Sequence, residues 1–174
     1  MTKKMISRMD KIRIMAGGIA LIIGAMIYLT DRPPDRTYFV QRSPVDISLY
    51  DARTKMFGAA GDHLPAFIHV FSFVLITAGV ISGGKRVDAA VCLSWVAVNC
   101  AFELGQKFKF LSVKLVPGFF SDIPFLENTK SFFLTGTFDM FDLAAVFLGG
   151  ISAWFVLSST TERKPCLIKK KMVI

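Results

Sequence analysis

Residues 64–84 read LPAFIHVFSFVLITAGVISGG and contain no charged side chain across 21 positions. A helix needs about 20 predominantly apolar residues to cross the hydrocarbon core of a bilayer. Three further charge-free gaps, of 17, 14 and 19 residues, lie at 14–30, 89–102 and 143–161. Four such segments in 174 residues leave too little polar surface for a soluble protein. The sequence therefore predicts an all-α integral membrane protein built as a four-helix transmembrane bundle.

We place the four helices at about residues 12–30, 65–84, 88–106 and 139–160 of one membrane domain, with long loops at about 31–64 and 107–138. The first helix follows a basic segment, as the apolar core of a signal peptide does. No A-x-A-like cleavage site follows it, and its apolar run exceeds the ~7–15 residues typical of such a core. We therefore expect a retained helix.

The net charge of +8 is a topology signal. Twelve of the 21 Lys and Arg lie in the N-terminal segment, at Lys85 and Arg86, and in the C-terminal tail. Because Lys and Arg accumulate on the cytoplasmic side, both termini are predicted to be cytoplasmic and both long loops external, in the bacterial inner membrane. Nucleic acid is not an expected partner, whereas membrane lipids are.

Two further patterns describe packing surfaces. The second loop carries seven Phe, at positions 108, 110, 119, 120, 125, 132 and 133. They either lie in the outer leaflet as an interfacial segment or pack against the bundle. Small residues recur at four-residue spacing at Ala16, Ala20 and Gly24, and at Ala145, Gly149 and Ala153. Such rows allow close helix approach, within this bundle by preference or against a protein partner.

The third apolar gap brings polar residues to the outer boundary of the membrane. Its 14 residues cover about 21 Å, against a hydrocarbon core of about 30 Å, so the helix extends outward past its apolar part. Asn99, Glu103 and Gln106 are spaced i, i+4, i+7 and share one face there. Glu103 lies near a helix C-terminus, which is unfavourable for an anion, and therefore needs a partner.

Two other helices reach the same depth with polar groups. Asp139 and Asp142 lie in the first turn of the fourth helix, and His69 lies about one turn below the start of the second, with His63 just above it. Asp139 is either a helix cap or part of a site. His69 is either a core histidine bonded to Glu103 or Asp142 or part of the same site. Ionisable residues at membrane depth are costly and tend to be functional.

Several chemistries suit these carboxylates and imidazole: divalent-cation binding, acid–base catalysis, a proton relay or a structural hydrogen-bond network. The chain lacks the spacing of a zinc or phosphate-loop signature and lacks G-x-S-x-G and H-E-x-x-H. We assign no metal and no cofactor, and we favour binding over catalysis.

Three segments resemble the VanZ-like family of small bacterial membrane proteins, across about residues 62–150. They are HVFSF from His69, ELGQ from Glu103, and GTFDMFD ending at Asp142, followed by Gly149. This chain departs from the family at two positions, because the family often has Arg where Gly136 stands and Asn where Val146 stands. If that Arg pairs with an acid of the polar cluster, then in this chain the pair is missing or another cation replaces the Arg. The resemblance implies a polytopic plasma-membrane protein, and the founding members are associated with glycopeptide resistance.

The first functional hypothesis is a binding protein for a lipid head group or a lipid-linked cell-envelope precursor. Glu103, Asp139 and Asp142 would supply the anionic groups, with His69 and Gln106 orienting them. The second hypothesis is a non-catalytic accessory subunit of a larger membrane complex, in which the polar cluster is structural. A third is a membrane hydrolase or transferase acting on lipid-linked substrates.

Overall fold

The computed structural model describes residues 8–34, 47–51, 53, 55–124 and 126–160. Within these residues the secondary structure is entirely helical, and four helices are long and apolar enough to cross a membrane. They are α1 (Arg8–Asp31), α3 (Ala60–Ile81), α4 (Lys85–Lys107) and α7 (Met140–Thr160). The predicted all-helical fold with four long apolar helices is confirmed, as expected for a multi-pass membrane protein.

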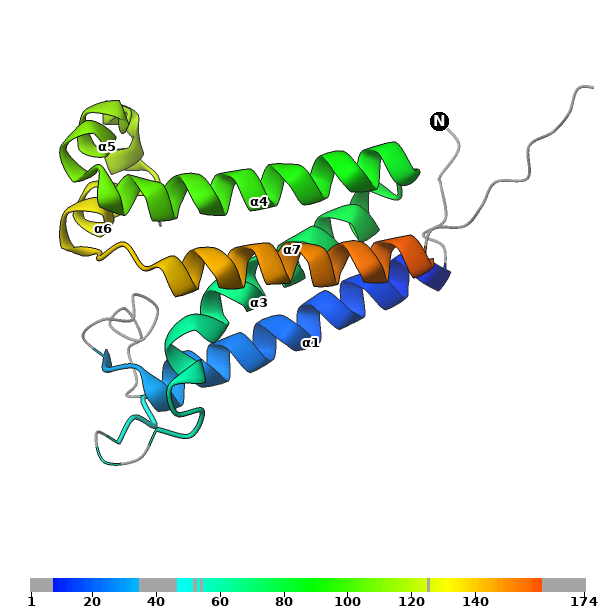
Figure 1. The fold of residues 1–174 in the computed structure, drawn as a ribbon, viewed down its shortest axis with the longest axis horizontal. Coiled ribbons are helices and arrows are strands. Elements are labelled where there is room, and N and C mark those ends of the chain that lie inside the picture. Colours follow the sequence, from blue (N-terminus) through cyan, green and yellow to red (C-terminus); the bar gives the residue numbers. More distant parts are fainter. Residues whose placement is uncertain (1–7, 35–46, 52, 54, 125, 161–174) are drawn as a thin grey trace, which may run out of the picture.

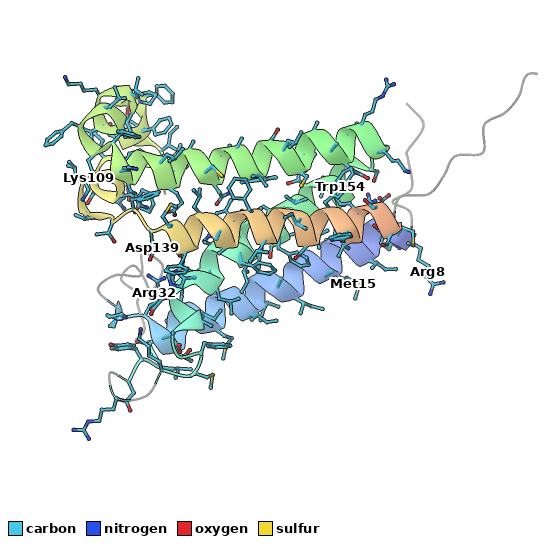
Figure 2. The ribbon with its side chains drawn as sticks, viewed as in Figure 1. Arg8, Met15, Arg32, Lys109, Asp139 and Trp154 are labelled. Carbon is cyan, nitrogen blue, oxygen red and sulfur yellow. The ribbon has the colours of Figure 1, made fainter. Side chains whose placement is uncertain are left out.

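The four helices alternate in direction, so the bundle has two distinct ends (Figure 1). At the loop end, α1 and α4 finish, α3 and α7 begin, and the 107–138 connection folds as α5 (Lys109–Leu115), the 3-10 helix η2 (Gly118–Asp122) and α6 (Thr129–Thr135). At the terminal end, α1 begins and α7 finishes. Figure 2 places Arg32, Lys109 and Asp139 at the loop end and Arg8 at the terminal end.

Helices α1 and α4 begin three to four residues earlier than predicted, and α3 differs from its prediction at both ends. α3 begins at Ala60, about five residues earlier than expected, and therefore includes His63 and contains Pro65 in its second turn. It stops at Ile81 because Ser82 adopts a left-handed conformation (φ 51°) and its N–H bonds the carbonyl oxygen of Ala78. This is a common way for a helix to end. The basic segments at 1–7 and 161–174 lie outside the described residues.

Helix α3 lies at the centre of the bundle and packs against α1, α4 and α7. The core beside it consists of fully buried side chains such as Val70, Val74, Leu75 and Leu157. Large apolar side chains face outward from the other spanning helices, including Met15, Leu93 and Phe155. An apolar exterior around an apolar core is the pattern of a helix bundle surrounded by lipid.

The small residues lie where helices approach most closely. A Cβ built on Gly17 of α1 would lie 2.8 Å from the carbonyl oxygen of Ser72. A Cβ built on Gly149 of α7 would lie 2.6 Å from the carbonyl oxygen of Phe67. Ala145 and Ala153 are also buried, so the predicted fourth-helix row packs inside the bundle. The preference for internal packing over a partner surface is confirmed for this row.

A buried ion-pair network joins three helices at the terminal end. The Arg13 side chain is 2% exposed and the Asp88 side chain 1%, and Arg13 Nη2 lies 3.2 Å from Asp88 Oδ2. Arg13 also donates to Thr160 Oγ1 (2.7 Å) and to the Leu157 carbonyl (3.2 Å), and lies 3.7 Å from Asp10. In the sequence, Arg13 is one of the five cations of the N-terminal segment and indicates topology, whereas the structure gives it a packing role between α1, α4 and α7.

Candidate functional site

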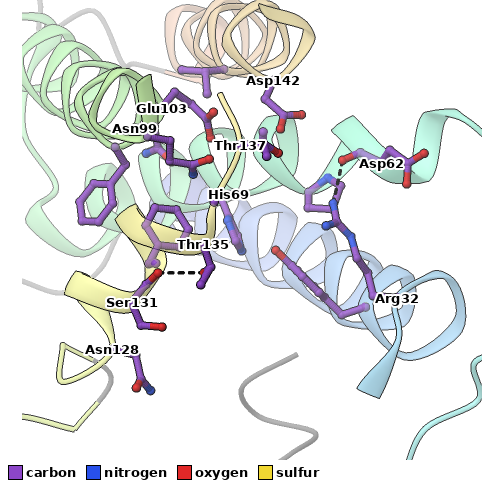
Figure 3. A pocket seen from close by; sticks show the side chains of 18 residues that line it. Arg32, Asp62, His69, Asn99, Glu103, Asn128, Ser131, Thr135, Thr137 and Asp142 are labelled. Atoms are coloured by element: carbon purple, nitrogen blue, oxygen red, sulfur yellow. Dashed lines mark hydrogen bonds between the residues drawn. The ribbon is translucent and has the colours of Figure 1, made fainter. Parts of the chain in front are cut away.

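A cavity of about 1040 Å³ opens at the loop end of the bundle (Figure 3). Its walls come from the end of α1, the first half of α3, the last turns of α4, helix α6 and the start of α7. Five of the six residues predicted from the sequence line it: His69, Asn99, Glu103, Gln106 and Asp142. The structure therefore brings together, around one hollow, residues that lie up to 73 positions apart in the sequence. Their role in binding a ligand stays a prediction.

Asp139, the sixth predicted residue, does not line the cavity and instead caps α7. Its Oδ1 accepts the N–H of Phe141 at 2.8 Å, and its backbone carbonyl accepts the N–H of Leu143. This is the geometry of a helix N-cap, which the sequence analysis considered as one of two interpretations. The capping role places Asp139 beside the site, at its edge.

The two histidines have different surroundings from those expected. His63, in the first turn of α3, has its Nδ1 atom 2.8 Å from Oδ1 of Asp142. His69 lines the cavity between aromatic rings, with its centroid 6.1 Å from that of Tyr28 and 5.9 Å from that of Phe73. The contact with Asp142 that the sequence analysis considered for His69 is thus made by His63. The extra turn at the start of α3 explains the difference, because it carries His63 onto the same helix.

His63, Asp139 and Asp142 also offer three ligand atoms that lie within 4.8 Å of one another. An imidazole nitrogen and two carboxylates are a donor set that a divalent cation accepts. Each side chain is partly exposed, and both carboxylates already make contacts within the protein. The arrangement is compatible with a cation but is fully explained by helix capping and the His63–Asp142 hydrogen bond.

Helix α4 carries three polar side chains that differ in their hydrogen bonding and burial. Asn99 donates from Nδ2 to the carbonyl oxygen of Trp95 at 2.8 Å, which leaves its own carbonyl oxygen as an acceptor. Glu103 has a buried Oε2 atom with no hydrogen-bond partner among the described residues. Gln106 is buried, and a Cβ built on Gly136 would lie 2.7 Å from its Cδ and Oε1 atoms. The Gln106 amide thus occupies the space that the Cβ of any residue larger than glycine would need at position 136.

The cavity contains one cation that the sequence analysis did not assign to the site. Arg32 follows the last residue of α1 and lines the cavity, with its guanidinium carbon 5.7 Å from the centroid of the Tyr28 ring. Its Nη2 atom donates to the carbonyl oxygen of Asp62 at 2.8 Å. The i, i+4 spacing of Tyr28 and Arg32 is a cation–π pattern that could have identified the pair.

Asp31 holds this cation in place. Its carboxylate accepts the N–H groups of Met56 (3.0 Å) and Phe57 (2.8 Å) and the hydroxyl of Thr30 (2.8 Å). These bonds tie the end of α1 to the segment that precedes α3. Because Arg32 is the next residue, its backbone position relative to α3 is fixed by the same contacts.

Helix α6 forms the remaining wall and was not predicted. Asn128, Ser131 and Thr135 line the cavity and are spaced i, i+3, i+7, so that they share one helix face. Phe132 and Phe133 lie 5.8 and 5.5 Å, between ring centroids, from Phe102 of α4, and the Phe132 and Phe102 side chains line the cavity as well. Part of the Phe-rich loop therefore packs against the bundle and holds the polar face of α6 over the cavity.

The other part of the Phe-rich loop faces outward. Phe108, Phe110, Leu111, Leu115 and Phe119 are exposed, and together they form what we call the Phe surface. Helix α5 has no buried residue. Phe125, the fifth of the seven Phe along the loop, lies outside the described residues. Packing against the bundle thus applies to one part of the loop, and an interfacial position of the exposed part stays a prediction.

The comparisons with known proteins identify no relative. No protein-family model, no curated protein and no solved structure matches this chain. The class that fold and cavity define is a multi-pass helical membrane protein with a polar cavity at one end of its bundle. The resemblance to the VanZ-like family stays a prediction that rests on the three quoted segments.

Proposed function

We propose that this protein lies in the bacterial plasma membrane and binds the polar head group of a lipid, or of a lipid-linked cell-envelope precursor, in the loop-end cavity. In this orientation the loop end faces outward and both termini are cytoplasmic. The supporting charges at the terminal end include Arg8, Lys11, Lys85 and Arg86, because Lys and Arg are concentrated on the cytoplasmic side.

The observation that carries the proposal is the character of the cavity. Ligand cavities typically measure about 300–1,000 Å³ and present a few polar groups that converge on the ligand. This cavity, of about 1040 Å³, is large enough for a head group and far larger than a single ion needs. Its wall includes Arg32, Glu103 and Asp142 together with amide and hydroxyl side chains. Placing ionisable groups at membrane depth is costly, which supports a functional reason for keeping them there.

The neighbouring Phe surface supports a lipid as the source of that head group. It exposes large apolar side chains at the loop end, with Lys109 and Lys114 on the same short helix, α5. Apolar side chains combined with cations suit the boundary between head groups and acyl chains. A segment held at that depth would place the cavity at the level of the lipid head groups.

Two alternatives remain as outcomes of the test. An accessory subunit is supported by the Phe surface as a partner contact, but the small-residue row on α7 is already used inside the bundle. A hydrolase or transferase is supported by the His63–Asp142 hydrogen bond, in which a carboxylate orients an imidazole as it does for a general base.

The proposal is tested by purifying the protein in a mild detergent and measuring bound lipid per protein by mass spectrometry and phosphate analysis. Glu103→Gln combined with Asp142→Asn should reduce the retained lipid. Asp122→Asn, which neutralises an exposed carboxylate on η2, is the matched control and should retain it. A folded double variant with unchanged lipid content would contradict the proposal. A stoichiometric protein partner would favour the subunit, and lipid-linked substrate turnover that Asp142→Asn abolishes would favour the enzyme.

A further inference from the structure

The charged groups of the cavity are separated onto different walls. Arg32 comes from the end of α1, while Glu103 and Asp142 come from α4 and α7. Figure 3 shows Glu103 and Asp142 on one side of the hollow and Arg32 on another. Among the described residues, Arg32 forms no ion pair with either carboxylate. The hollow is thus bordered by a positive pole and a negative pole.

The positive pole is held rigidly and keeps unused donors. A guanidinium has five N–H donors, and the hydrogen bond of Arg32 to a carbonyl oxygen uses one of them. Its Nε atom is buried without a hydrogen-bond partner among the described residues. Asp62, whose backbone carbonyl accepts from Arg32, directs its carboxylate to Lys55 Nζ at 2.9 and 3.0 Å. Arg32 therefore keeps its charge and its fork geometry, which suit a phosphate.

The negative pole has no Lys or Arg partner within the described part of the chain. Asp142 Oδ1 lies 2.8 Å from His63 Nδ1, and Glu103 has an unpartnered Oε2 atom. Leaving a buried polar atom without a partner is costly, and a donor on a ligand can offset that cost. The Asn99 carbonyl oxygen adds an acceptor on the same helix as Glu103. Acceptors of this kind suit a group with several N–H donors.

We infer that the cavity takes a zwitterionic head group, a phosphate ester that carries a primary amine, with the phosphate at Arg32 and the ammonium at Glu103 and Asp142. The inference rests on the proposed head-group function and names its ligand class. A phosphate without an amine brings no N–H donor to the unpartnered Oε2 atom of Glu103. A trimethylated amine has no N–H to donate to them, and its usual recognition is by aromatic faces.

The experiment uses the full chain in micelles of a neutral detergent and short-chain phosphatidylethanolamine, phosphatidylcholine and phosphatidylglycerol as probes. Binding is followed by the rise in thermal unfolding temperature, which increases with ligand concentration relative to Kd. The ethanolamine lipid should bind about tenfold more tightly than the other two, a factor that corresponds to ~1.4 kcal/mol. Equal affinity for the choline and ethanolamine lipids would overturn the inference.

The variants give a crossed pattern that separates the two poles. Arg32→Gln should weaken binding of both the ethanolamine and the glycerol lipid, while Glu103→Gln should weaken only the ethanolamine lipid. Arg32→Lys keeps the positive charge, so it serves as the second variant if Arg32→Gln fails to fold. Its binding should be intermediate between those of the unmodified protein and Arg32→Gln. Lys11→Gln, an exposed residue near the start of α1 at the opposite end of the bundle, is the control for loss of a cation. Equal weakening of every lipid by Glu103→Gln would overturn the assignment of the poles.

The results also separate this inference from the proposed function. If the three lipids bind alike and the cavity variants weaken all of them, the head-group function stands and the zwitterion is refuted. If no cavity variant changes any binding, both are refuted. If soluble glycerophosphoethanolamine binds as tightly as the lipid, the two poles are supported and the lipid source in the proposed function is refuted.

Discussion

Removal of the Arg13 side chain is expected to destabilise the bundle by about 3–5 kcal/mol, which is the usual cost of breaking a buried ion pair from one side. The pair with Asp88 is almost completely buried, with side chains 2% and 1% exposed. Arg13→Ala removes the cation from Asp88 and also removes the donors to Thr160 and to the Leu157 carbonyl. Asp88→Ala is expected at the lower end of the range, because Asp10 still lies 3.7 Å from the guanidinium.

The assay is the free energy of unfolding in mixed micelles, measured by titration with a denaturing detergent. A double-mutant cycle with Arg13→Ala and Asp88→Ala should give a coupling energy of about 1–3 kcal/mol. Lys55→Ala is the control, because the Lys55–Asp62 pair is shorter, at 2.9 Å, but 42% and 49% exposed. An exposed pair contributes about 0–1 kcal/mol. The reasoning would be refuted if the Arg13 and Asp88 single variants lost no more unfolding free energy than Lys55→Ala and if their effects were additive in the double variant.

Three further predictions concern other parts of the fold. Gly149→Leu should lower stability in detergent by about 1–3 kcal/mol or more, because even a Cβ at this position would lie 2.6 Å from a backbone carbonyl of α3. Gly18→Ala should stabilise α1 by ~0.5–1 kcal/mol, because a Cβ there would meet no atom within 4 Å. Equal shifts in the unfolding temperature of the two variants would contradict this prediction. Asp139→Ala should cost about 0.5–2 kcal/mol through loss of the α7 cap, and Asp139→Ser should restore most of it. Phe110→Trp, at a side chain 83% exposed, should show fluorescence quenched by lipids brominated near the head group and not by an aqueous quencher; the reverse would place α5 in water.

The four spanning helices could be predicted because absence of charge over about 20 residues is a property of the sequence alone. The start of α3 at Ala60 could not, since residues 60–63 are polar or small and join the helix through contacts of the folded chain. One such contact is at Gly61, where a Cβ would lie 2.6 Å from Asp31 Oδ2. A side chain at position 61 would therefore displace the Asp31 carboxylate, which joins the end of α1 to the segment before α3.

Prediction of the cavity succeeded where helical periodicity and depth sufficed and failed where a wall came from a loop. Asn99, Glu103 and Gln106 share one face of a single long helix, so their convergence follows from spacing. Arg32 was assigned to the loop because it lies just beyond an apolar span, and nothing in the local sequence shows that it turns back toward α3. Helix α6 is only seven residues long, and its position depends on the packing of Phe132 and Phe133.

The two ends of the bundle arrange their opposite charges differently, and this difference bears on whether the polar cavity is structural or binds a ligand. At the terminal end, Arg13 reaches Asp88 directly and the space between them is closed, which is how this protein builds a structural ion pair. At the loop end, Arg32 and Glu103 border the same hollow, and each keeps a buried polar atom without a partner among the described residues. A cluster whose purpose was to join helices would gain most by closing that gap, as the terminal end does. Opposite charges kept on separate walls of a head-group-sized cavity are explained more simply by a ligand that lies between them.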